Sequence, residues 1–193
     1  MKRLLITCAF ISLGLAAQVA AAKLKARADF DKTTDFKSMQ TWDWDAAGPG
    51  EVKLARASGD DPEAVRRRIE PTLVAAVEKE MTARGFKKAA AGAVPDIRVH
   101  YYVLVTVGIA AQTMGQFLPT VTEWGIPPYM PATQSFDVVQ RGAIVLDVVS
   151  TKVAHVVWRG IAEGDIDKIK DDAERDEMIR DGVKELVKKL PRK

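Results

Sequence analysis

The chain has 193 residues, of which 47% are hydrophobic and 28% charged, a composition typical of a folded globular domain. Its formal net charge is only +3, which argues against a nucleic-acid partner, because such a partner requires a strongly basic face. The chain has one cysteine, Cys8, so it cannot form an internal disulfide.

Residues 1–22 have the pattern of a cleavable secretory signal peptide. Lys2 and Arg3 form a short positive end, residues 4–17 are almost all apolar, and residues 20–22 are three small alanines. An uncleaved membrane anchor is the alternative interpretation. The apolar run is shorter than the roughly 20 residues that a membrane-spanning helix needs, so the signal peptide is favoured.

We therefore expect cleavage between Ala22 and Lys23 and an exported protein of the periplasm or cell envelope. Cys8 lies inside the apolar run rather than after it, so we expect no lipid anchor. Removal of residues 1–22 leaves 171 residues with 27 basic and 26 acidic side chains. This length predicts a single domain over residues 23–193.

Strands are predicted where apolar residues alternate. Odd positions from Ile97 to Val107 are apolar or aromatic, whereas the even positions begin with polar residues, so one face should be buried and the other wetter. Residues 136–149 show the same period and are followed by a turn at 150–154. A returning strand with Trp158 on its inner face completes an antiparallel hairpin. Residues 24–30 and 41–44 predict two shorter strands.

Two amphipathic helices are predicted from three-and-four spacing and from their ends. The first begins at Asp60 or Asp61, with Pro62 in the first helical position, and ends at Gly85. Pro71 lies inside it and predicts a kink or a restart. The second begins in the acidic run 171–174 and ends before Pro191. The expected fold is a two-layer α+β domain, an antiparallel sheet of about five strands with both helices packed on it.

Three segments in this order resemble the bacterial envelope family called domain of unknown function 4136 (DUF4136). They are the opening Asp29–Trp44 pattern, Gly85-Phe86 with the later Pro95-Asp96-Ile97, and Gly142 to Asp147 with Trp158-Arg159-Gly160. The resemblance implies an exported protein without an established activity. This chain departs from the family in lacking a usable lipidation cysteine, in Ser150 at the hairpin turn, and in its insertion at 108–135.

The insertion at residues 108–135 is rich in glycine, proline and large apolar side chains. A loop this long is uncommon in a compact domain and is often functional. We therefore predict a contact surface for an envelope protein, a peptide or a lipid, and the alternative is a lid that folds back over the core. The residues predicted to bind are Met114, Phe117, Trp124, Tyr129 and Met130.

Catalytic signatures are weak. His100, His155 and Asp147 are the side chains that a small hydrolase with a cleft beneath the loop would use, and a shared pocket is what that alternative requires. Two histidines without ligand spacing predict no metal site, and no motif predicts a cofactor. Asp147 and Arg159 are expected to form a structural ion pair. The favoured function is a non-catalytic binding module, and a pure scaffold role is the third hypothesis.

Overall fold

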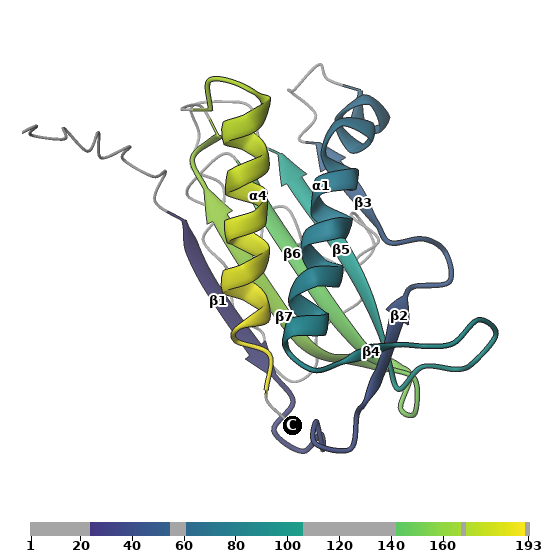
Figure 1. The fold of residues 1–193 in the computed structure, drawn as a ribbon. Helices are drawn as coiled ribbons and strands as arrows, with labels where there is room; N and C mark the ends of the chain where they lie inside the picture. Colours follow the sequence, from purple (N-terminus) through teal and green to yellow (C-terminus); the bar gives the residue numbers. More distant parts are fainter. Residues whose placement is uncertain (1–23, 55–60, 106–141, 167–168, 192–193) are drawn as a thin grey trace, which may run out of the picture.

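The computed structural model describes residues 24–54, 61–105, 142–166 and 169–191, which form one sheet with two helices on one face (Figure 1). The sheet has seven strands. Their bounds are β1 Lys25–Phe30, β2 Thr41–Trp44, β3 Gly50–Leu54, β4 Lys87–Lys88, β5 Ile97–Val105, β6 Gly142–Ser150 and β7 His155–Gly164. The helices are α1, Pro62–Ala83, and α4, Asp172–Val187.

The sheet is mixed, so the prediction of an antiparallel sheet of about five strands is wrong in both respects. The strands follow the order β1-β7-β6-β5-β2-β4. Strand β3 also pairs with β5, along the part of β5 that follows the residues paired with β2. The pairs β1–β7, β7–β6 and β6–β5 are antiparallel, whereas β2 and β3 run parallel to β5. The reason is that α1 lies between β3 and β5 and carries the chain back to the end at which β3 began.

The helices begin and end where the sequence predicts. The Asp61 side chain accepts hydrogen bonds from two backbone N–H groups of the first turn of α1, and the Asp171 side chain accepts one, from Glu174, at the start of α4. After α1, Gly85 has a φ of 90°, the left-handed conformation that commonly terminates a helix. The helix continues through Pro71, so the predicted restart does not occur. Both helices run in the same direction along the sheet (Figure 1).

The main core lies between the helices and the sheet. The odd positions of β5 that were predicted to be buried face this layer, and Trp158 is only 1% exposed, as expected. They pack against the apolar stripes of the helices, with Leu73, Val77, Val183 and Leu186 fully buried. An irregular register between Val148 and Val149 pairs Val149 with Val156. Trp158 therefore lies on the inner face as predicted, whereas Val156, which a strict period of two would also place there, lies on the other face.

The other face of the sheet is also buried, which the sequence pattern did not predict. Tyr102, Leu104, Val145 and Ile161 on this face are all less than 5% exposed. The buried pair of Asp147 and Arg159 lies on the same face. The central strands therefore have two buried faces, which explains why their sequences are almost continuously apolar.

Candidate functional site

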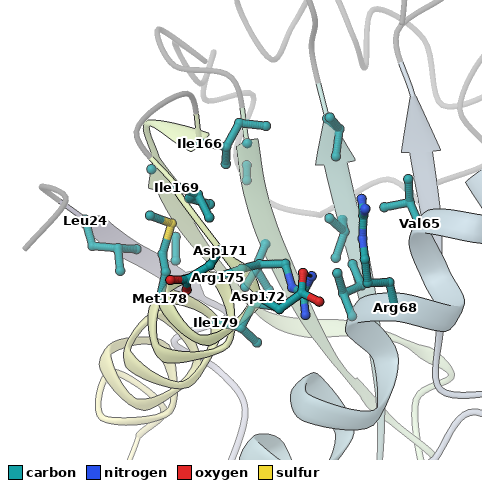
Figure 2. A pocket seen from close by; sticks show the side chains of 18 of the residues that line it. Leu24, Val65, Arg68, Ile166, Ile169, Asp171, Asp172, Arg175, Met178 and Ile179 are labelled. Atoms are coloured by element: carbon teal, nitrogen blue, oxygen red, sulfur yellow. Dashed lines mark hydrogen bonds and ion pairs between the residues drawn. The ribbon is translucent and has the colours of Figure 1, made fainter. Parts of the chain in front are cut away.

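A cavity of about 390 Å³ lies between the beginnings of the two helices and the sheet. Its floor is the end of β5, the start of β6 and the end of β7, and its walls come from α1, α4 and the residues that precede α4 (Figure 2). The lining residues are Leu24, Val65, Arg68, Ile69, Val103, Val105, Gly142, Ala143, Ile144, Ala162, Gly164, Ile166, Ile169, Lys170, Asp171, Asp172, Arg175, Met178 and Ile179.

The floor carries small residues, Gly142, Ala162 and Gly164, near the strand ends. A Cβ at Gly142 would lie 2.6 Å from Ile166, and one at Gly164 would lie 3.2 Å from Met178, so the two glycines let these lining side chains approach the sheet. Further along the same layer, Trp158 and Leu186 fill the volume between β7 and α4 and are almost fully buried. The layer is thus close-packed around Trp158 and Leu186, and it contains the cavity at the end where the helices begin.

The walls are apolar. Val65 and Ile69 come from α1, whereas Met178 and Ile179 come from α4, and Ile169 precedes α4 (Figure 2). Ile69 and Ile179 are buried, and the other three are half-buried. Burial of such side chains against an apolar ligand is favourable by about 25 cal/mol per Å² removed from water.

Charged side chains surround the mouth, and several of them are already paired. Arg175 donates hydrogen bonds to Asp176 at 2.8 and 3.1 Å and also pairs with Asp172. The hydrogen bond from Arg175 holds the pKa of Asp176 below its ordinary value. Asp171 accepts the backbone N–H of Glu174 at 2.9 Å as the α4 cap. The two carboxylates that line the mouth, Asp171 and Asp172, therefore already accept hydrogen bonds from the protein.

Arg68 and Lys170 are the cations of the mouth that have no such partner. Both are exposed, and neither side chain forms a hydrogen bond or an ion pair among the described residues. Figure 2 shows Arg68 on α1, on the opposite side of the cavity from Arg175. Three cations and two carboxylates line the mouth, so its formal charge is +1.

A second hollow lies on the outer side of the helix pair and has a different character. It is an open groove of about 610 Å³ between α1 and α4. Cations and carboxylates alternate along it, among them Lys79, Glu80, Glu177 and Arg180. Such a mixture is typical of a solvated helix surface, so this groove is not the better binding site.

The residues predicted to bind lie outside the part of the chain that the structure describes. This applies to Met114, Phe117, Trp124, Tyr129 and Met130, and also to Ala22 and Lys23 at the predicted cleavage site. The segment that carries the first five nevertheless joins the sheet after Val105 and before Gly142. Both of these residues line the cavity.

None of the three side chains of the hydrolase alternative lines either of the two hollows described above. Asp147 and His100 are cross-strand neighbours on the face away from the helices, and neither cavity described above includes them. Arg159 donates two hydrogen bonds to Asp147, at 2.6 and 2.5 Å, so the expected ion pair is confirmed, although it is buried. His155 is exposed at the hairpin turn and contacts the carbonyl of Val153.

Two further features concern metals and membranes. Within residues 24–54, 61–105, 142–166 and 169–191, no group of three or more His, Cys, Asp or Glu side chains could hold a metal ion. In the same part of the chain, no helix is both long and apolar enough to cross a bilayer.

Sequence reasoning missed the cavity, although it had placed the elements that form it. Val65 and Met178 belong to the three-and-four spacing that predicts the two helices, and the structure places both at the cavity wall. Two local signals mark the site. One is the basic run Arg66-Arg67-Arg68 near the start of α1, and the other is the glycine at each strand end, Gly142 and Gly164.

The family model of DUF4136, a domain of unknown function, matches residues 26–192. No curated protein matches the chain. A crystal structure of a DUF4136 family protein from Bacteroides thetaiotaomicron is similar, with a TM-score of 0.52 and 14% identity over 87% of this chain and 96% of that chain. At this identity the likeness shows a shared fold.

Two other solved structures are less similar. A PDZ domain protein from Parabacteroides distasonis has a TM-score of 0.49 and 13% identity, over 90% of this chain and 38% of that chain. The PelC dodecamer from Paraburkholderia phytofirmans has a TM-score of 0.34 and 8% identity, over 84% of this chain and 98% of that chain.

Proposed function

The chain belongs to the DUF4136 family, and from that premise we propose that it is a non-catalytic binding module of the cell envelope. Its ligand site is the cavity between α1, α4 and the sheet. The observation that carries the proposal is a hollow of about 390 Å³ with apolar walls and a charged mouth. Pockets for small ligands have this combination of apolar lining and few polar groups, and volumes of about 300–1,000 Å³.

Binding is favoured over catalysis by the chemistry of the lining. Among the described residues that line the cavity, none is Ser, Thr, Cys or His. Asp171 and Asp172, the carboxylates at the mouth, are engaged by a helix cap and by Arg175. A nucleophile with an adjacent base, the arrangement that covalent catalysis requires, is therefore not assembled by these side chains.

The wider setting of the proposal comes from the sequence. The pattern of residues 1–22 supports export to the periplasm or envelope. The insertion at residues 108–135 remains the proposed contact surface for an envelope protein, a peptide or a lipid. Its attachment beside the cavity, at Val105 and Gly142, supports a role of both features in one binding site.

The test is titration of the purified protein with N-phenyl-1-naphthylamine, a neutral apolar dye whose fluorescence rises on burial. We expect saturable binding of one dye per chain. Val65→Trp fills the cavity from the half-buried wall of α1 and should weaken binding at least tenfold. Val94→Trp is the matched control, because Val94 is 79% exposed and does not line the cavity.

Non-saturable dye binding, or equal weakening by the two tryptophan variants, would refute the cavity as the ligand site.

Export is tested by the N-terminal sequence of the protein isolated from cells. Protein recovered from the envelope fraction should begin at Lys23, and an intact N-terminus at Met1 would contradict the predicted cleavage.

A further inference from the structure

We infer that the cavity accepts a single-chain amphiphile with an anionic head group, its chain between the helices and its head against Arg68. This inference rests on the proposed binding function and specifies the class of ligand. It follows from the separation of the lining into an apolar interior and a mouth with a formal charge of +1, where Arg68 and Lys170 form no ion pair among the described residues.

The interior requires an apolar chain. Its buried lining residues include Ile69, Val103, Ala143, Ala162 and Ile179, none of which has a polar side-chain atom. The backbone groups of the floor strands are paired in the sheet ladders. A polar group placed there would lose its hydrogen bonds to water without gaining others from these side chains, which is unfavourable.

The mouth favours an anion. Arg175 is held by Asp172 and Asp176, so it contributes little free charge. Arg68 and Lys170 are exposed and have no polar partner among the described residues, so both are free to approach a head group. The two helices also begin at this end of the layer, and their positive dipole ends add to the same preference (Figure 1).

The volume favours one chain over two. At about 390 Å³ the cavity lies near the lower end of the range for ligand sites, about 300–1,000 Å³. A guanidinium such as that of Arg68 can bind a carboxylate or a phosphate through two parallel hydrogen bonds. The head group is thus defined by its charge and its oxygen acceptors.

The experiment is displacement of N-phenyl-1-naphthylamine by three probes with the same ten-carbon chain, each kept below its micelle concentration or its solubility limit. Decanoate is anionic, decan-1-ol is neutral and decyltrimethylammonium is cationic. We expect decanoate to displace the dye at the lowest concentration and the cation at the highest. Arg68→Gln should raise the decanoate concentration needed by about fivefold and leave decan-1-ol unchanged.

Arg67→Gln is the control, because Arg67 is the preceding residue of α1, is 70% exposed at its side chain and does not line the cavity. Lys170→Gln is a second test variant and should act in the same direction as Arg68→Gln. Equal displacement by decanoate and decan-1-ol, or equal effects of Arg68→Gln and Arg67→Gln, would overturn the anionic head. Neither result would change the saturable dye binding and its loss in Val65→Trp, which test the cavity as the ligand site.

Discussion

Trp158 fills the space between β7 and α4 because Gly160, two residues further along the strand, has no side chain. A Cβ at Gly160 would lie 2.3 Å from the Trp158 ring and 3.1 Å from Leu186. Gly182 in α4 faces the same sheet, but a Cβ there would be 3.5 Å from the nearest atom, an ordinary contact. The two glycines thus differ in whether a methyl group fits.

This difference predicts opposite effects of the same substitution. Gly160→Ala should lower the free energy of unfolding by about 1–3 kcal/mol, because the indole ring must leave its packed position. Gly182→Ala should raise it by about 0.5–1 kcal/mol, because alanine is the better residue in a helix interior. Urea denaturation of both variants measures the effects. Stabilisation by Gly160→Ala would show that the ring adjusts freely.

The ion pair between Asp147 and Arg159 could be predicted from the sequence, but its burial could not. Their alternation on facing strands predicts the ion pair, and the two hydrogen bonds confirm it. Burial of the pair depends on the second face of the sheet and is not contained in the alternation. A one-residue slip of the hairpin would move both charges to the helix face, so the pair also favours the native register.

Within α1, Pro71 is the residue that is least favourable for a helix. It lies in the tenth position of a 22-residue helix and is exposed. Proline has no N–H to donate to the preceding turn, and its ring crowds that turn. The helix nevertheless continues, since Ile69 and Leu73 on either side are buried in the core and hold the backbone in place.

Pro71→Ala should therefore stabilise the protein by about 1–3 kcal/mol, because a hydrogen bond is restored and the strain is removed. Thermal unfolding followed by circular dichroism is a suitable measurement. Ala75→Pro, at an exposed site one turn further along α1, should destabilise by a similar amount or more. An unchanged melting temperature for Pro71→Ala would mean that the proline costs nothing in this helix.

The sheet, with two buried faces, makes the stability of the whole molecule sensitive to alkaline pH. Burial raises the pKa of Tyr101, and the nearby Glu70 carboxylate adds to this rise. Burial likewise raises the pKa of Tyr102, with a further contribution from Asp147. In both cases the folded protein favours the neutral phenol, whose ordinary pKa is about 10.

Stability should thus be insensitive to these tyrosines below about pH 10 and fall as the pH rises above it, since the unfolded chain then releases their protons more readily. Each tyrosine contributes a slope of at most about 1.4 kcal/mol per pH unit. Urea titrations between neutral pH and pH 11 measure the slope, and Tyr102→Phe should reduce it. An identical slope in Tyr102→Phe would contradict this origin.

Much of the molecule is readable from local pattern. The caps at Asp61 and Asp171 define where the helices begin, because capping depends on side chains within a few residues of the helix end. Period-two alternation likewise located β5, β6 and β7, because it depends only on side chains at neighbouring positions of one strand. The order of three short motifs indicated the family, which the match over residues 26–192 establishes.

The remaining properties depend on which distant segments meet. The parallel pairing of β2 and β3 with β5 follows from the return of the chain through α1. No local sequence pattern predicts this pairing. The cavity exists where the ends of three strands meet the starts of two helices that are far apart in sequence. The sequence by itself determined the helices, the longer strands and the family, because these depend on near neighbours, but it did not predict the short strands β3 and β4. Only the tertiary structure decided the sheet, its second buried face and the site, because packing across the chain sets them.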